Sequence, residues 1–233
     1  VVQFRGCSAE PNRLARSYHA GDTGDMAFAF EHIQRRYPAR KFAAIGYSLG
    51  GNALLKWLGE GESPALSAAV AVSVPFDLGA SADTLNRGFA RIYQRYLIAA
   101  LHRTLTARPQ ALEPAQSAAL LELTSSSDFW EFDDRITAPL HGFKDVHDYY
   151  QRCSSSQYLQ HIKVPTLLLQ ALDDPFVAPN AVPKQRDLPG CVTLELSDRG
   201  GHVGFIAQCP RSALKPMYWL EQRIPSFLSA TVA

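Results

Sequence analysis

The sequence has few cysteines, and their spacing argues against two common kinds of site. Its 233 residues include four cysteines, and no two lie close enough in the chain for the paired spacing of a zinc site or a redox dithiol. We therefore expect reduced thiols in a cytoplasmic protein, or small apolar side chains buried in its core. The positions concerned are Cys7, Cys153, Cys191 and Cys209.

Long apolar runs and an excess of either charge are also missing. No run approaches the roughly 20 apolar residues that cross a bilayer, and the chain does not begin with a charged-then-apolar signal segment. Lys and Arg total 23 against 22 Asp and Glu, and the basic residues are scattered. We therefore expect no nucleic-acid partner and a small, uncharged or mildly polar substrate.

The beginning of the chain looks like a strand already in progress. Val1–Phe4 is rich in β-forming residues, the first residue is not Met, and a polar, turn-prone surface loop is predicted over 5–13. We therefore expect the natural protein to continue upstream, and a membrane contact through that upstream part stays open.

Four mostly apolar runs predict the strands of a sheet. Each is bounded by Pro, Gly or Asp, and strands that are apolar throughout are typical of parallel sheets with helices on both faces. The runs are 41–47, 68–75, 164–172 and 192–196. Helical spacing of apolar residues predicts helices over 23–37, 50–60 and 213–228. The sequence therefore predicts an α/β fold.

Between the second and third of these runs lies a long helical segment, 81–161, which is rich in aromatic residues and offers no obvious strand. Such an insertion is a candidate lid over the crevice at the carboxyl ends of the strands. The alternative is a set of extra helices on the flank of the sheet. The chain then divides into a core part over 1–80, a helical lid or cap over 81–161, and a second core part over 162–233.

The strongest chemical signal is Gly46-Tyr47-Ser48-Leu49-Gly50, which matches G-x-S-x-G between a predicted strand and a predicted helix. A sharp turn there would expose Ser48 as a nucleophile, and the flanking glycines would let neighbouring backbone approach closely. The helix that follows points its free N–H groups at the site where an oxyanion would form. We expect the Leu49 N–H to be one oxyanion-hole donor.

A serine nucleophile needs a base, and the base needs an acid to orient it. Candidates for both follow later in the chain, in the order Ser, Asp, His that is typical of proteins with a G-x-S-x-G turn. Asp173 and Asp174 directly follow the third apolar run, and His202 lies in a glycine-flanked loop after the fourth. We therefore predict His202 as the base and either Asp174 or Asp173 as the acid. Adjacent side chains point in different directions, so only one of the two carboxylates is expected to reach the histidine.

The other six histidines lack this context, although His19 and His141 are further candidates for the substrate site. No cluster of His, Cys and Asp residues has the spacing of metal ligands, which disfavours a metal enzyme. Serine at the turn disfavours a dehalogenase, because that chemistry in this arrangement uses a carboxylate.

Many segments of the sequence resemble the YheT-like carboxylesterase branch of the α/β-hydrolase superfamily, which is similar to the eukaryotic abhydrolase-domain phospholipases. The turn extended by Gly51-Asn52 is far more specific than G-x-S-x-G alone, and the resemblance spans nearly the whole chain. The segments that carry it are Phe4-Arg5-Gly6-Cys7, Glu10-Pro11-Asn12-Arg13, Ser17-Tyr18-His19, 46–52, 55–60, Phe132-Asp133, Thr137-Ala138-Pro139, Gly142-Phe143, Tyr149-Tyr150, Pro165-Thr166-Leu167, 173–176 and Gly200-Gly201-His202.

The resemblance implies an α/β-hydrolase fold and hydrolysis of short- or medium-chain acyl esters, through an acyl-enzyme intermediate and without a metal or an organic cofactor. It also favours Asp174 as the acid, with Asp173 as the alternative, because the pattern acid-Pro-x-Val recurs after this strand in related proteins. Three alternatives stay open: an acyltransferase or a thioesterase using the same residues, and a binding protein that has lost catalysis. One departure is that such proteins carry further N-terminal strands and a His-Gly-type loop that supplies a second oxyanion donor. The sequence contains neither, so those strands are expected to be missing from this chain.

Overall fold

The fold is built around a parallel sheet of four strands. The computed structural model describes residues 1–8, 10, 12, 16–61, 64–107, 112–123, 127–209 and 212–232. The strands lie in the order β1-β2-β3-β4, and each neighbouring pair is parallel. They are β1 Ala43–Tyr47, β2 Ala68–Val72, β3 Thr166–Ala171 and β4 Val192–Ser197. The α/β fold with a parallel sheet, predicted from the four apolar runs, is therefore confirmed.

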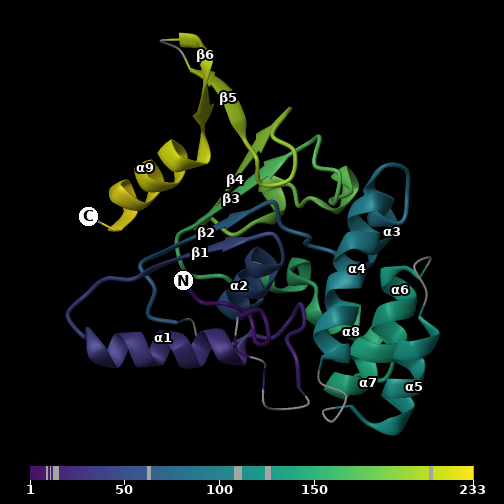
Figure 1. Ribbon diagram of the computed structural model, residues 1–233. Helices are drawn as coiled ribbons and strands as arrows, with labels where there is room; N and C mark the ends of the chain where they lie inside the picture. The colour runs from purple at the N-terminus through teal and green to yellow at the C-terminus, as the bar shows by residue number, and fades with distance from the viewer. Residues whose placement is uncertain are drawn as a thin grey trace.

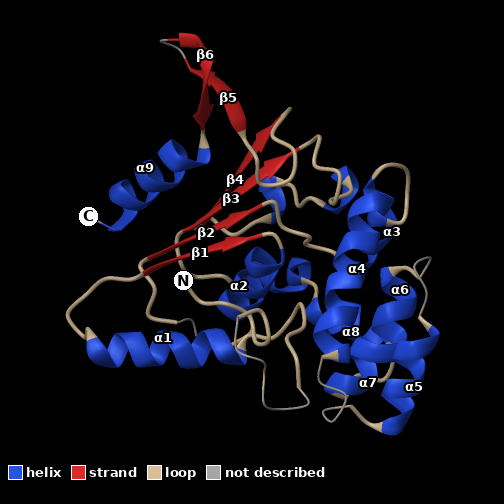
Figure 2. Cartoon of the chain, viewed as in Figure 1, coloured by secondary structure: helices blue, strands red, loops and turns tan. Residues whose placement is uncertain are grey.

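Helices surround this sheet, as Figure 2 shows. The α-helices are α1 Gly24–Arg36, α2 Leu49–Gly59, α3 Leu78–Leu85, α4 Ala90–Thr106, α5 Pro114–Glu122, α6 Phe129–Phe132, α7 Ala138–His141, α8 Val146–Cys153 and α9 Leu220–Val232. The shorter segments are the π-helical turn η2 Asp133–Thr137 and the 3-10 turns η3 Ser155–His161, η4 Pro179–Ala181 and η5 Gln185–Asp187. Helices α1 and α2 lie on one side of the sheet and α9 on the other (Figure 1).

Alternating residues of β2 and β3 supply the two cores, because successive side chains of a strand point to opposite faces. Every residue of both strands is buried. On one face, helix α2 packs on Ala69, Ala71 and Leu168. On the other face, helix α9 packs on Val70, Val72, Leu167 and Leu169. The apolar residues of these strands therefore pack against helices on both faces of the sheet.

The helical insertion between β2 and β3 lies beyond the carboxyl ends of the strands. Figure 1 shows helices α3 to α8 grouped at that end of the sheet. Their described residues contain no strand, as predicted for 81–161. Among the described helices, none combines the length and the apolar character needed to cross a membrane.

One buried side chain, Asn52, connects the core to this end of the molecule. Its amide nitrogen donates to the carbonyl oxygens of Ala20 and Cys153 at 3.0 and 2.9 Å, and its amide oxygen accepts the N–H of Ser155 at 2.9 Å. The side chain is fully buried in helix α2. Asn52 therefore joins the N-terminal segment, the end of α8 and the start of η3.

Replacing Asn52 with Ala is expected to lower the free energy of unfolding by about 3–5 kcal/mol, because three buried backbone groups lose their partner. Urea unfolding of the two proteins measures the difference. The matched control is Asn180→Ala at an exposed position of η4, where we expect a change within about 0.5 kcal/mol. A loss at Asn52 as small as the loss at Asn180 would contradict this role.

Two predicted elements are wrong. The helix predicted over 213–228 is a helix only in its second half, because Ser212–Tyr218 forms strand β6, antiparallel to β5 Ile206–Cys209. Pro216 lacks the N–H that a helix interior needs, and in β6 it lies opposite Gln208 beside a register shift in this two-stranded sheet. Val1–Phe4 forms no strand, because it pairs with no described strand. The loop predicted over 5–13 falls partly outside the described residues.

Candidate active site

Ser48 lies at the sharp turn between β1 and α2. Its backbone has φ 50° and ψ −122°, a conformation that non-glycine residues seldom adopt and that costs about 1–3 kcal/mol. The turn depends on close backbone packing, because a Cβ at Gly46 would lie 2.5 Å from the carbonyl oxygen of Gly50. The N–H of Leu49 belongs to the first turn of α2, whose N–H groups have no partner within the helix.

His202 and Asp174 reach Ser48 from two other loops. The imidazole Nε2 of His202 lies 2.9 Å from the hydroxyl Oγ of Ser48, and its Nδ1 lies 3.1 and 3.0 Å from the two carboxylate oxygens of Asp174. Ser48 follows β1, Asp174 follows β3 and His202 follows β4, so all three come from the carboxyl ends of parallel strands. The structure thus brings together three side chains that lie up to 154 positions apart.

The two neighbouring carboxylates have different partners. Asp174 is 5% exposed and faces the imidazole of His202. Asp173 instead accepts the backbone N–H groups of Gly200 and Gly201, both at 2.8 Å, and so fixes the loop that carries the histidine. Of the two acids left open by the sequence, Asp174 is the one in contact with His202.

Three further residues position these groups, and sequence reasoning missed them. The hydroxyl of Ser73 accepts the N–H of Val203 at 3.0 Å, next to His202. The amide of Gln170 donates to Asp174 at 3.1 Å, and the ring of Phe176 lies 4.2 Å from the His202 ring. Gln170 had a visible signal, since it is the one strongly polar residue in the apolar run of β3.

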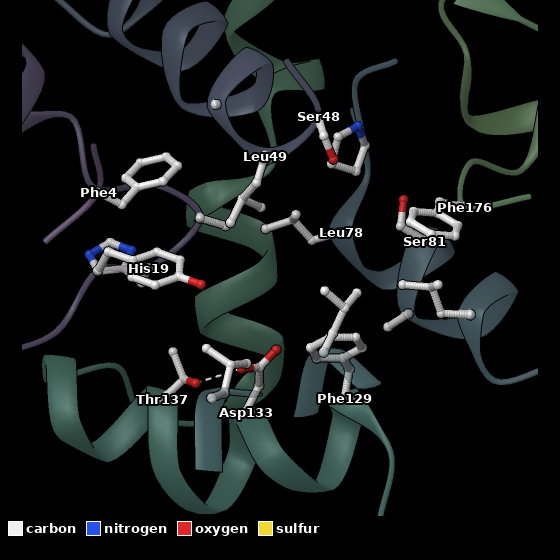
Figure 3. Close-up of a pocket in the computed structure, with 18 of the residues that line it drawn as sticks. Phe4, His19, Ser48, Leu49, Leu78, Ser81, Phe129, Asp133, Thr137 and Phe176 are labelled. Carbon is white, nitrogen blue, oxygen red and sulfur yellow. Dashed lines mark hydrogen bonds between the residues drawn. The ribbon is translucent and has the colours of Figure 1, made fainter. Parts of the chain in front are cut away.

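A cavity of about 630 Å³ opens beside Ser48. Its walls come from the core loops, from the N-terminal segment around Phe4 and His19, and from helices α3, α4, α6 and α8. Figure 3 shows Ser48 and Leu49 on one side of this cavity and Phe129 and Asp133, from the helical insertion, on the opposite side. The insertion therefore forms one wall of the space that Ser48 faces.

His19 and His141 lie beside each other, with ring centroids 4.7 Å apart, and His19 lines the cavity. Burial lowers the pKa of His19 to about 3 and that of His141 to about 4, so both imidazoles are neutral at pH 7. The Gly21 N–H donates to Nδ1 of His19 at 3.2 Å, which places the ring proton of the neutral form on Nε2. Neither histidine forms a hydrogen bond with Ser48, and His141, unlike His19, does not line the cavity.

Asp133 is the buried acid on the far side of the cavity. Its carboxylate accepts hydrogen bonds from the hydroxyl groups of Thr137 at 2.5 Å and Tyr150 at 2.7 Å. Burial raises the pKa of Asp133 to about 6, although these two hydrogen bonds act in the opposite direction. The folded protein therefore favours the neutral carboxyl group more than the unfolded chain does.

This raised pKa predicts how stability depends on pH. The contribution of Asp133 is fully present below about pH 4 and is lost as the pH rises through about 6. Asn at this position cannot ionise, so the stability of Asp133→Asn relative to the natural protein should rise between pH 4 and 7, by on the order of 3 kcal/mol. Urea unfolding at several pH values measures this. Parallel pH profiles of the two proteins would contradict it, and Asp134→Asn is the control.

The described residues contain three free cysteines and no cluster of potential metal ligands. Cys7, Cys153 and Cys191 are free thiols, and the side chain of Cys209 lies outside the described part. In that same part, no group of three or more His, Cys, Asp or Glu side chains is arranged to hold a metal ion.

Sequence comparison gives a family and several relatives. The profile of a protein family described as alpha/beta hydrolase fold matches residues 2–207. YheT of Escherichia coli (strain K12), named as a candidate esterase, is 44% identical over 98% of this chain and 67% of its own length. A Mus musculus protein named phospholipase ABHD3 is 30% identical over 88% of this chain and 50% of its own. A Saccharomyces cerevisiae protein named monoacylglycerol lipase is 31% identical over 88% of this chain and 47% of its own. The chain thus spans two thirds of YheT and about half of the two eukaryotic proteins.

Solved structures show the same fold at much lower sequence identity. The Pyrococcus furiosus esterase Pf2001 superposes with a TM-score of 0.53 at 17% identity, over 94% of this chain and 64% of that one. An acylaminoacyl peptidase superposes with a TM-score of 0.56 at 15% identity, over 98% of this chain and 31% of that one.

Proposed function

Because the chain belongs to the α/β-hydrolase fold family, we propose that it is the catalytic part of a serine carboxylic-ester hydrolase in which Ser48, His202 and Asp174 form the catalytic triad. The observation that carries this proposal is the continuous chain of hydrogen bonds from Asp174 through His202 to the hydroxyl of Ser48, at the edge of a cavity. The esterase, phospholipase and lipase names of the relatives support it.

The first half of the reaction transfers the acyl group to the enzyme. Nε2 of His202 takes the proton of Ser48 as Oγ attacks the ester carbonyl carbon, and the carbonyl oxygen becomes an oxyanion. The Leu49 N–H, at the positive end of α2, donates a hydrogen bond to that oxyanion. When the ester C–O bond breaks, His202 gives its proton to the leaving alcohol, and the acyl group remains on Ser48.

The second half returns the enzyme to its starting state. His202 takes a proton from water as the water oxygen attacks the acyl-enzyme carbonyl, and then returns a proton to Ser48 as the acid leaves. In both halves the carboxylate of Asp174 accepts a hydrogen bond from the Nδ1–H of His202 and stabilises the imidazolium. Asp173 acts through the loop, because it binds the backbone just before His202.

The size and the lining of the cavity favour an acyl ester of short or medium chain length as the substrate. Its volume of about 630 Å³ and its largely apolar lining, which includes Leu49, Leu78 and Phe129, suit a hydrocarbon chain with few polar groups. No metal or organic cofactor enters the proposed reaction. We also propose a cytoplasmic location, which the free thiols of the described cysteines support.

The test uses the full-length protein, with p-nitrophenyl esters of increasing acyl length and a fluorophosphonate probe for the nucleophile. We expect covalent labelling at Ser48 and the highest kcat/KM at a short or medium acyl chain. Parallel assays with acyl thioesters and with an alcohol acceptor compare hydrolysis with thioesterase and acyltransferase activity. Absence of labelling together with absence of turnover would overturn the proposal and favour a binding protein.

A further inference from the structure

Asp133 places a carboxylate in the wall of the cavity that the proposed hydrolase would use for its substrate. The residue begins the π-helical turn η2, and such turns often occur at functional sites. It is 8% exposed and lines the same cavity as Ser48 and His202. In Figure 3, its side chain lies across the cavity from Ser48, with Leu49 and Leu78 between them.

The hydrogen bonds of Asp133 leave part of its carboxylate unused. An ionised carboxylate offers about four acceptor positions. Two are taken by the hydroxyl groups of Thr137 and Tyr150. Among the described residues, no Lys, Arg or His forms an ion pair with it. Acceptor positions therefore remain for a donor from a ligand in the cavity that Asp133 lines.

Ser81, another residue that lines the cavity, has a polar atom without a partner among the described residues. The hydroxyl of Ser81, on helix α3, is buried in a residue that is 6% exposed, and it has no hydrogen bond among the described residues. A buried hydroxyl without a partner is unfavourable, because it has given up its hydrogen bonds to water. Asp133 and Ser81 thus place two polar residues in the wall of a largely apolar cavity.

We propose, building on the proposed esterase function, that Asp133, held by Thr137 and Tyr150, forms a subsite for a hydroxyl group on the part of the ester that occupies the cavity. The hydroxyl donates to the carboxylate. The same carboxylate rejects substrates that place a negatively charged group there. Asp133 is therefore a specificity-determining residue, and the substrate class is an ester with a hydroxyl group remote from its ester bond.

A hydroxyl end group is expected to bind better than a methyl or a carboxylate end group, for a different physical reason in each case. A methyl group leaves the free acceptor positions of Asp133 without a donor after water has been excluded. A carboxylate brings a like charge into a cavity where little solvent screens it. The hydroxyl supplies a donor and adds no charge.

The test compares esters of equal length that end in hydroxyl, methyl or carboxylate, in one series on the acyl part and in a second series on the alcohol part. With the full-length protein, we expect a kcat/KM about 10-fold or more higher for hydroxyl than for methyl in one of the two series. In that series, the carboxylate ester should be at least about 100-fold poorer than the hydroxyl ester. The series that responds identifies which part of the ester fills the cavity.

Asp133→Asn removes the charge at nearly constant shape, so the penalty against the carboxylate ester should fall at least about 10-fold relative to the hydroxyl ester. The matched control is Asp134→Asn. That exposed neighbour holds the N–H of Val146 at 3.0 Å and does not line the cavity, so both ratios should stay as in the natural protein. Equal rates for all three end groups in both series, or ratios that Asp133→Asn leaves unchanged, would overturn the proposal.

Binding of the same esters to Ser48→Ala protein, followed by tryptophan fluorescence, separates this inference from the proposed function. If the natural protein hydrolyses none of the esters, the esterase proposal fails, and the dissociation constants still decide the inference. The hydroxyl ester should then bind about 10-fold tighter than the methyl ester. Equal dissociation constants would overturn it.

Discussion

Replacing Ser48 with Ala is expected to lower ester turnover by a factor on the order of 10⁶. The reason is that the hydroxyl lies 2.9 Å from Nε2 of His202 and faces the cavity, so it is the atom that His202 can activate. Without it, His202 and Asp174 have no nucleophile to act on, and the fluorophosphonate probe has no site. Initial rates with p-nitrophenyl esters and mass spectrometry of the labelled protein measure both effects.

The control for this substitution is Ser156→Ala, which removes an exposed hydroxyl in η3. We expect it to leave turnover within about 2-fold of the natural protein, since it lies outside the cavity lining. His202→Ala should reduce turnover nearly as much as Ser48→Ala, because the two residues act as a unit. Full turnover by the Ser48→Ala protein, with an unchanged melting temperature, would show that another residue carries the reaction.

The sequence was sufficient to predict the turn at Ser48 and the loop at His202, because each depends on short-range backbone chemistry. Glycines flank both residues, and each sits between a strand-like run and a region of different character. The order of the four parallel strands then brings the loops after β1, β3 and β4 together at one edge of the sheet. Local signals therefore determine the turn and the loop, and the strand order brings them together.

Which of Asp173 and Asp174 contacts His202, and which one holds the loop, could not be derived from the residues alone. Both are carboxylates in the same turn, and only the three-dimensional path of the 200–202 loop decides which one meets the imidazole and which one meets the backbone. Similarly, Asp133 belonged to a segment that carried the family resemblance, yet nothing local placed it in a cavity wall with Ser48. Contacts across the cavity depend on how the insertion packs against the core.

The hairpin of β5 and β6 could not be predicted from the sequence for a different reason. Its apolar residues also fit a helical pattern, and helix α9 begins only two residues after β6 ends. The strand depends on pairing with β5, which periodicity within one short segment does not reveal. Pro216 and Pro225 were visible as interruptions, but Pro225 lies inside helix α9 and Pro216 lies in the strand. Proline alone therefore did not locate the boundary.

Replacing Asp174 with Asn is expected to lower kcat by about 10⁴, because an amide in this place favours the wrong imidazole tautomer and does not stabilise the imidazolium. Asp173→Asn is the matched comparison, with the same chemical change one residue away. Its side-chain oxygen still accepts the N–H groups of Gly200 and Gly201, so we expect a loss of no more than about 10-fold.

Both variants remove one carboxylate charge from the same turn. A difference between their losses of activity therefore comes from the different contacts of the two side chains. Steady-state kinetics on one p-nitrophenyl ester, with the melting temperature as a check on folding, give the ratio of the two losses. A ratio near 10³ in the expected direction would mean that contact with Nδ1 of His202, rather than negative charge in the neighbourhood, is what the reaction requires. Equal losses, or a larger loss at Asp173, would mean that the carboxylate holding the loop is the one on which the base depends.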